Sequence, residues 1–112
     1  MRISKIVEKL NLEVIAGYDK TKEDNRAEGV FICDLLSLVM AKSRSLDIWI
    51  TIQTHVNIIA VASLMELSAI IIAEDMEIDE ETIVKADEVN VPLFKSELSA
   101  YELASKLSEL GV

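Results

Sequence analysis

The chain has 112 residues, a length that suits one domain burying about two-thirds of the surface its unfolded chain would expose. Residues 51–112 hold three basic and twelve acidic side chains and account for the net charge of −9, so we do not expect nucleic acid as a partner. The single cysteine argues against a disulfide framework, and the charged amino terminus argues against a signal peptide. The sequence lacks about 18 consecutive apolar residues, so we expect no membrane span. Together these features favour a cytoplasmic protein.

The first part of the chain predicts a helix, a strand and a polar connection. Apolar residues recur at helical spacing between Ile3 and Leu10, which predicts a short amphipathic helix. Leu12 to Ala16 alternate as in a strand. The segment Gly17–Gly29 is so polar that we expect an exposed loop.

A short strand and a capped helix follow. Val30 to Cys33 form an apolar run, and Asp34 has the side chain that an N-cap requires. The apolar residues after it predict a helix from Leu35 toward Ser43.

The central stretch Asp47–Glu74 predicts one βαβ unit. Two β-branched runs, Asp47 to Thr51 and Ala69 to Ile72, enclose a helix over His55 to Leu67 that is apolar nearly all round. A helix with so little polar surface should be the most buried helix of the domain or lie in a subunit contact.

The last third predicts two more helices and a strand. Ile78 to Val89 has a helical pattern, and Asp79 has the side chain of its N-cap. Val91 to Phe94 is a strand, and Ser96 is the predicted cap of the last helix, which ends at Gly111.

Strands that alternate with helices predict the α/β class. We expect a single compact domain over residues 1–112, with a largely parallel sheet of about five short strands and helices packed against it. In such a sheet the turns after parallel strands open on the carboxyl edge, where open α/β folds bind ligands. The polar residues of these turns would share one rim: Asp34, Thr54, His55, Asn57, Glu74, Asp75 and Ser96.

The turn from Gln53 to Asn57 is the strongest candidate site, because the first N–H groups of a helix have no intrahelical partners. We predict a ligand contacting Gln53, Thr54, His55, Asn57 and Ser96. The alternative is that Asp34, Thr54 and Ser96 only cap three helices, each worth about 1 kcal/mol.

His55 has three interpretations. Its ring can be neutral and held by a nearby carboxylate or backbone group, it can contact a ligand, or it can bind a metal together with Glu74 and Asp75. A lone histidine lacks the paired spacing of strong zinc sites, so we predict no metal and no cofactor. Cys33 with His55 as its base would be a nucleophilic pair, but a lone thiol in an apolar run is more typical of core packing.

Four segments together resemble the DRTGG domain, a module similar to the amino-terminal domain of HPr kinase/phosphorylase. They are Asp47-Ile48-Trp49-Ile50-Thr51, Ala69 to Ile72, Asp79-Glu80-Glu81-Thr82-Ile83 and Val91-Pro92-Leu93-Phe94-Lys95-Ser96. The resemblance covers most of the chain. It implies a regulatory or assembly part without an established catalytic role.

The signature residues of that family are replaced in this chain. Gln53-Thr54-His55 stands where the family usually has Gly-Asp-Arg, and Ala73-Glu74-Asp75 stands where it has Thr-Gly-Gly. Paired glycines let a backbone approach a phosphate closely, whereas two carboxylates repel one. We therefore expect a bare anion to be disfavoured, while a nucleotide with a divalent cation or a basic protein surface meets less opposition.

Two functional hypotheses follow. The first is a non-catalytic regulatory or protein-interaction module that offers an acidic face to a basic partner. Hydrophobic residues make up 51% of so small a chain, so apolar surface should remain exposed and support a homodimer or other homo-oligomer. The second hypothesis is a sensor for a small, nucleotide-like molecule bound at Gln53 to Asn57.

Overall fold

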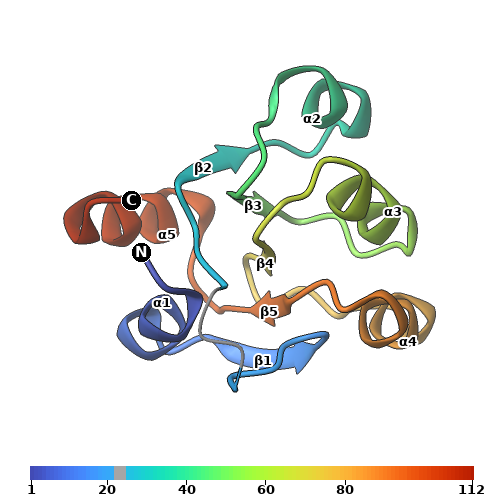
Figure 1. The fold of residues 1–112 in the computed structure, drawn as a ribbon, viewed down its shortest axis with the longest axis horizontal. Coiled ribbons are helices and arrows are strands. Elements are labelled where there is room, and N and C mark those ends of the chain that lie inside the picture. The colour runs from blue at the N-terminus through green and yellow to red at the C-terminus, as the bar shows by residue number, and fades with distance from the viewer. Residues whose placement is uncertain (22–24) are drawn as a thin grey trace.

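The computed structural model describes residues 1–21 and 25–112 and confirms the predicted α/β class. Within these ranges five strands form one mixed sheet with helices on both faces (Figure 1). Part of the predicted loop Gly17–Gly29, residues 22–24, lies outside the described residues. In chain order the elements are α1 (Ile3–Leu10), β1 (Glu13–Ala16), β2 (Gly29–Ile32), α2 (Leu36–Lys42), β3 (Asp47–Thr51), α3 (Asn57–Leu64), β4 (Ala69–Ile72), α4 (Glu80–Val89), β5 (Leu93–Lys95) and α5 (Ala100–Leu110).

The strand order is β1-β5-β4-β3-β2. Strands β2, β3, β4 and β5 are parallel neighbours, which confirms the largely parallel sheet. The exception is β1, which pairs antiparallel with β5 and places Glu13 opposite Lys95. The amino end of β1 therefore lies beside the carboxyl end of β5.

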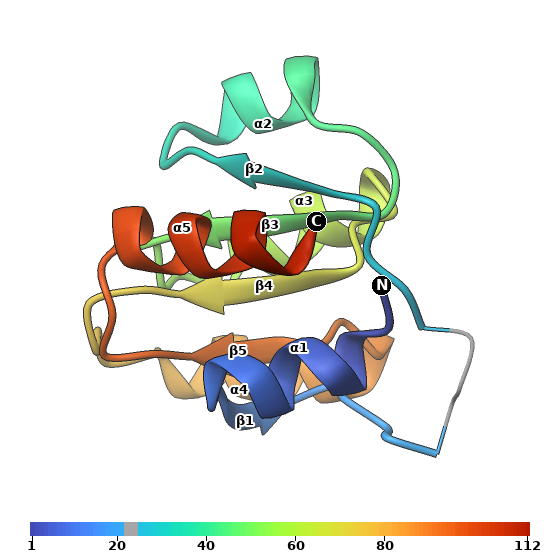
Figure 2. The same ribbon diagram turned by 90° about the vertical axis from the view of Figure 1, so that its left-hand side faces the viewer.

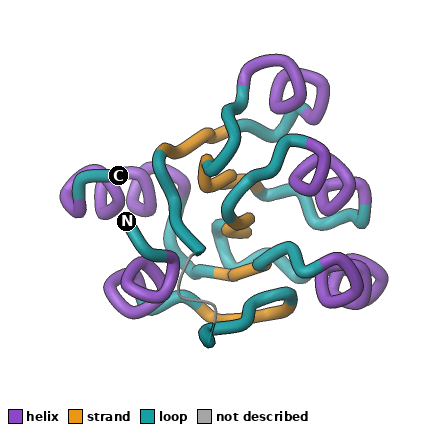
Figure 3. The backbone as a smooth tube through the Cα atoms, in the orientation of Figure 1, coloured by secondary structure: helices purple, strands orange, loops and turns teal. Residues whose placement is uncertain are grey.

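The sheet separates two helical layers. In Figure 1, α1 and α5 lie on the left of the sheet and α2, α3 and α4 on the right, and Figure 2 views the molecule from the α1 and α5 side. Figure 3 shows the short strands between these layers and the loops that lead out of the sheet. None of the helices within the described ranges is long and apolar enough to span a bilayer.

Alternation along the strands builds both cores, because successive side chains of a strand point to opposite faces. Ile48 and Ile50 are fully buried against the layer of α1 and α5. Trp49 between them is fully buried in the opposite core with α2, α3 and α4. Burial of each such side chain is worth about 1.5–3 kcal/mol, so both layers are held by the same short strands.

The central helix is shorter than predicted and keeps some of its apolar side chains exposed. Ile58, Ile59, Val61 and Ala62 are buried, as expected for an apolar helix. Leu64, however, is 71% exposed at the end of α3. The helix therefore leaves apolar surface facing outward.

The prediction that Asp34 caps a helix is wrong. Helix α2 begins at Leu36, and Leu35 occupies its N-cap position without a side-chain hydrogen bond. The Asp34 carboxylate instead accepts hydrogen bonds from Thr51 Oγ1 at 2.8 Å and from the Ile52 amide at 3.0 Å. The Asp34 carboxylate thus pairs with donors at the end of the neighbouring strand and not with amides at the start of α2.

The caps predicted at Thr54 and Ser96 are also wrong. Val56 occupies the N-cap position of α3 without a side-chain cap, two residues after Thr54. Helix α5 is capped by Ser99, whose hydroxyl accepts from the Glu102 amide while the Glu102 carboxylate accepts from the Ser99 amide. Because this reciprocal capping box caps the start of α5, Ser96 takes no part in the cap and lies in the loop before the helix.

Candidate functional site

The turns after the four parallel strands open at one edge of the sheet. This confirms the predicted rim at the carboxyl edge, where open α/β folds place their ligands. The rim contains two distinct polar regions. One is the Gln53–Asn57 turn, and the other is a cavity beside β5.

The first half of the Gln53–Asn57 turn is held by the connection between β2 and α2. The Gln53 side-chain nitrogen donates to the Asp34 carbonyl at 3.0 Å, and the Gln53 amide donates to Thr51 Oγ1 at 3.1 Å. Because Asp34 also holds Thr51, these contacts close a small network. Gln53 therefore positions two neighbouring turns with its donors.

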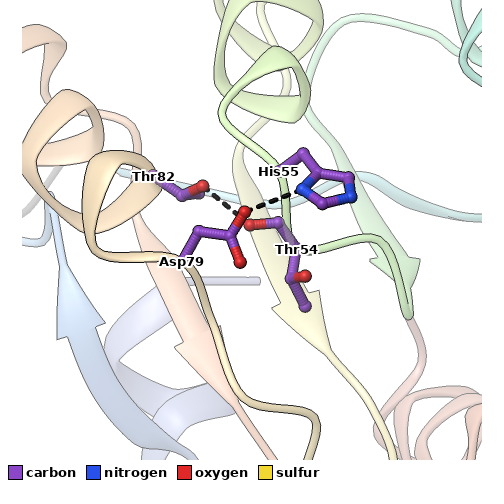
Figure 4. A network of polar contacts seen from close by, with 4 residues as sticks. All are labelled: Thr54, His55, Asp79 and Thr82. Carbon is purple, nitrogen blue, oxygen red and sulfur yellow. Dashed lines mark hydrogen bonds and ion pairs between the residues drawn. The ribbon is translucent and has the colours of Figure 1, made fainter.

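The second half of this turn is tied to the start of α4, as Figure 4 shows. His55 Nδ1 lies 2.7 Å from Asp79 Oδ2, with the two side chains 69% and 48% exposed. The hydroxyl of the fully buried Thr82 donates to the Thr54 carbonyl at 2.7 Å. Asp79 holds the N-cap position of α4, as predicted, but its carboxylate pairs with His55 and makes no cap hydrogen bond.

The interpretation of His55 as a ring held by a nearby carboxylate agrees with this geometry. The other ring nitrogen points away from Asp79 (Figure 4). Among the described residues, no three His, Cys, Asp or Glu side chains are grouped to hold a metal ion. The half-buried Cys33 thiol hydrogen-bonds only locally, 3.4 Å from the Leu35 amide and 3.6 Å from its carbonyl within the described residues, and Cys33 packs against the core, in agreement with the core-packing interpretation.

The five predicted ligand residues do not line one site. Gln53, Thr54, His55 and Asn57 belong to the same turn, and Asn57 is exposed as the first residue of α3. Ser96 is buried after β5 and lines the cavity there, which none of the other four residues lines. The sequence pattern placed these residues on one edge but could not resolve their separation along it.

The cavity beside β5 has a volume of about 660 Å³, within the range of small-molecule sites. Residues 10–13 at the end of α1 form one side of it, and residues 95–98 with Asp75 form the other. Leu10 and Leu12 are buried there, and Leu98 is half-buried. The cavity thus combines an apolar wall with several polar side chains.

The topology explains why a cavity forms at this position. Strand β4 leads to α4 on one face of the sheet, whereas β5 leads to α5 on the other (Figures 1 and 2). Where neighbouring parallel strands send their connections to opposite faces, the loops separate and leave a crevice at the carboxyl edge. Sequence reasoning missed this position because it requires the strand order.

The turn after β4 has an unusual backbone. Glu74 and Asp75 have φ values of 62° and 52°, in the left-handed region that glycine adopts most readily. The Glu74 amide donates to the Leu98 carbonyl at 2.9 Å, and the Asp75 amide donates to the Ser96 carbonyl at 2.8 Å. These two N–H groups therefore join the turns after β4 and β5 and do not face a ligand.

The geometry defines a three-layered α/β domain with its polar turns and a cavity of about 660 Å³ at the carboxyl edge of a mostly parallel sheet. The chain belongs to the DRTGG domain family, whose model matches residues 5–110. This confirms the resemblance seen in the sequence.

A solved structure supports the fold independently. It contains the CBS and DRTGG domains of the regulatory region of Clostridium perfringens pyrophosphatase, complexed with the activator diadenosine tetraphosphate. The two chains are 14% identical with a TM-score of 0.76, and the match covers 95% of this chain and 45% of that one. The chain therefore spans less than half of the structure it resembles. No curated protein matches the sequence significantly.

Proposed function

We propose that this domain is a non-catalytic regulatory or protein-interaction module whose acidic face receives a basic partner. The observation that carries the proposal is a run of exposed carboxylates at the carboxyl edge in a member of the DRTGG family. This acidic segment covers residues 74–81 and contains Glu74, Asp75, Glu77, Asp79, Glu80 and Glu81. The regulatory region of the Clostridium perfringens pyrophosphatase, which shares the fold, supports a regulatory role.

Salt dependence tests the acidic face, because ionic screening weakens attraction between exposed charges. A blocked tetralysine peptide serves as the probe, with affinity measured by calorimetry at about 50 and 500 mM salt. The E80Q/E81Q variant should bind it more weakly than the E8Q/E109Q variant, which loses the same charge from exposed positions on α1 and α5. An affinity that ignores salt, or equal losses in both variants, would contradict the proposal.

The proposed module is a homodimer that associates through the exposed apolar surface of α2 and the adjoining edge strand. Leu35 and Leu38 are 61% and 41% exposed, and Ile32 at the end of β2 is 50% exposed. Exposed large apolar side chains on an edge strand and the helix that follows it favour an association site here. Sedimentation should give twice the 12.5 kDa chain mass for the wild type and the chain mass for L35E/L38E. The control is Y101E, which adds charge at an 82% exposed position on α5 and should leave the dimer intact.

The alternative function is a sensor for a nucleotide-like molecule at the Gln53–Asn57 turn. It is favoured by the nucleotide activator in the related pyrophosphatase region and by the exposed His55 and Asn57 side chains. Diadenosine tetraphosphate and ATP, with and without Mg²⁺, are the probes for a thermal-shift assay. A ligand at about 100 times its Kd adds roughly 2.7 kcal/mol and should raise Tm by about 10 °C or more. The shift should vanish in H55A and persist in S63A, and a flat screen would reject the sensor.

A further inference from the structure

The lining of the cavity beside β5 carries more negative than positive charge. We propose that it binds a guanidinium or ammonium group carried on an aliphatic stem. This inference rests on the proposed function, in which the partner is a basic protein, and it specifies which chemical group of that partner is bound. The site itself is separate from both the Gln53–Asn57 turn and the first turn of α4.

The charges around the cavity favour a cation. Its lining holds three carboxylates, from Glu13, Asp75 and Glu97, and one ammonium group, from Lys95. Lys95 Nζ is paired with Asp75 Oδ1 at 3.2 Å, and its side chain is only 20% exposed. Glu13 and Glu97 are exposed and form no ion pair among the described residues. An entering cation therefore meets two carboxylates without partners.

The end of α1 adds to this field. Residues Leu10 and Asn11 place the carboxyl end of the helix at the cavity. The Glu8 and Val7 carbonyls accept from the Asn11 and Leu12 amides, and the end of the helix still carries the negative end of its dipole. This contribution comes from the backbone and is independent of the three carboxylates.

Two backbone donors beside the cavity are already engaged, so neither is available to an anion. The Asp75 amide donates to the Ser96 carbonyl, and the Leu98 amide donates to Ser96 Oγ. At the nearby start of α5, the Ser99 and Glu102 amides each donate to the other residue's side chain. The Glu102 carboxylate therefore lies where an anion would bind. A phosphate or carboxylate ligand would therefore meet the repulsion of the three carboxylates of the lining without hydrogen bonds from these two amides.

The apolar wall suits the stem of the ligand. Leu10 and Leu12 are buried and Leu98 is half-buried, so methylene groups can lie against them while the charged end meets the carboxylates. Arginine and lysine side chains have this form, and free alkyl amines and alkylguanidines share it. The experiment must therefore distinguish a protein segment from a free small molecule.

Nuclear magnetic resonance titration of the intact domain with n-butylguanidinium tests the site. The amides of Leu12, Glu13, Ser96 and Glu97 should shift with increasing concentration and saturate. Pentanoate, which has a similar stem and the opposite charge, is the matched probe and should leave them unchanged. Equal shifts with both molecules, or no saturable shift with n-butylguanidinium, would overturn the proposal.

Three variants locate the charge that is recognised. E13Q/E97Q should weaken n-butylguanidinium binding about three- to tenfold, whereas E80Q/E81Q, which removes the same charge from α4, should change it less than twofold. K95M frees Asp75 and should strengthen binding, whereas an anion site would lose affinity. Far-UV circular dichroism confirms that each variant is folded. Equal weakening in both glutamine pairs, or weakening in K95M, would refute the cation site.

A blocked peptide, acetyl-Ala-Arg-Ala-amide, separates the two sources. Saturable binding of the peptide, lost in E13Q/E97Q, supports a side chain of a basic partner. Binding of n-butylguanidinium with exclusion of the peptide retains the cavity site and overturns the protein source. Tetralysine binding to the acidic segment can be lost while cation binding in the cavity is unchanged. That result would show that the two surfaces act separately, so the two proposals can fail independently.

Discussion

Replacing Glu74 with glycine should stabilise the domain. Glu74 has a φ of 62°, and a non-glycine residue in the left-handed region is disfavoured by about 1–2 kcal/mol. Glycine relieves this strain and keeps the amide that donates to the Leu98 carbonyl at 2.9 Å. The stabilisation should exceed the loss of an exposed side chain that makes no hydrogen bond or ion pair within the described residues.

The expected gain follows from two opposing terms. Relief of about 1–2 kcal/mol is offset by the greater freedom of glycine in the unfolded chain, about 0.5–1 kcal/mol. The net increase in unfolding free energy is about 0–1.5 kcal/mol. Its midpoint, about 0.75 kcal/mol, corresponds to a rise in Tm of roughly 3–6 °C for a domain of this size. The same change at Asp75 should gain less, because it also removes the ion pair with Lys95.

Urea unfolding and calorimetry measure the effect, and E77G is the matched control. Glu77 is an exposed acid outside the helices and strands and is not among the residues with positive φ. E77G therefore removes the same charge without relieving strain, and it should lose about 0.5–1 kcal/mol. If E74G were no more stable than E77G, the left-handed turn would not be strained and the reasoning would fail.

Three further changes test other parts of the fold. G17A should lower the unfolding free energy of the domain by about 2–5 kcal/mol, measured by urea unfolding. The reason is that Gly17 has a φ of +70° and that a Cβ there would lie 1.9 Å from a backbone oxygen. A loss under about 1 kcal/mol would contradict this. T82V should cost about 1–3 kcal/mol by leaving the Thr54 carbonyl without its donor, and T82S, which keeps the hydroxyl, should recover most of it. Burial, and then the neighbouring Asp19, raise the pKa of Tyr18 above 10.0. Its stabilising contribution is therefore complete below about pH 10 and lost as pH rises through the raised pKa, so Y18F should flatten the alkaline fall in stability; an unchanged fall would refute this.

Most of the fold could be predicted because its signals are local and repeated. The helical spacing of Ile3, Ile6 and Leu10 matches the buried face of α1, and the β-branched runs became β3 and β4. Boundaries moved by one to three residues: the strand predicted from Val91 begins at Leu93, and the central helix predicted to end at Leu67 ends at Leu64. The antiparallel pairing of β1 with β5 depends on contacts between distant segments, so no local pattern reveals it.

The helix caps failed because several polar residues near a helix start compete for that position. The Asp34 carboxylate accepts a hydrogen bond from the Thr51 hydroxyl, a contact that sequence spacing does not reveal. For α5 a stronger signal was present, since Ser99 and Glu102 have the spacing of a capping box, and this pattern favours Ser99 over Ser96. Reading the paired residues rather than single caps would have corrected this prediction.

The edge prediction was right, but choosing between its two polar regions requires counting donors and acceptors. In the Gln53–Asn57 turn, Gln53 and His55 are engaged by Asp34 and Asp79, so a ligand there must displace contacts or use what remains exposed. In the cavity beside β5, the amides of Asp75 and Leu98 are engaged, whereas the carboxylates of Glu13 and Glu97 form no ion pair within the described residues.

The turn after β4 links the cavity to the departure from the family signature. Ala73-Glu74-Asp75 stands where the resemblance places Thr-Gly-Gly, yet Glu74 and Asp75 adopt the left-handed backbone that glycine favours. The substitution thus preserves a shape suited to glycine while adding two negative charges to the edge of the sheet, one of them in the cavity lining. At Glu74, which does not line the cavity, the effect falls on stability, whereas Asp75 adds its charge to the cavity lining. A glycine at Glu74 should therefore change stability more than cation binding, whereas E13Q/E97Q should do the reverse.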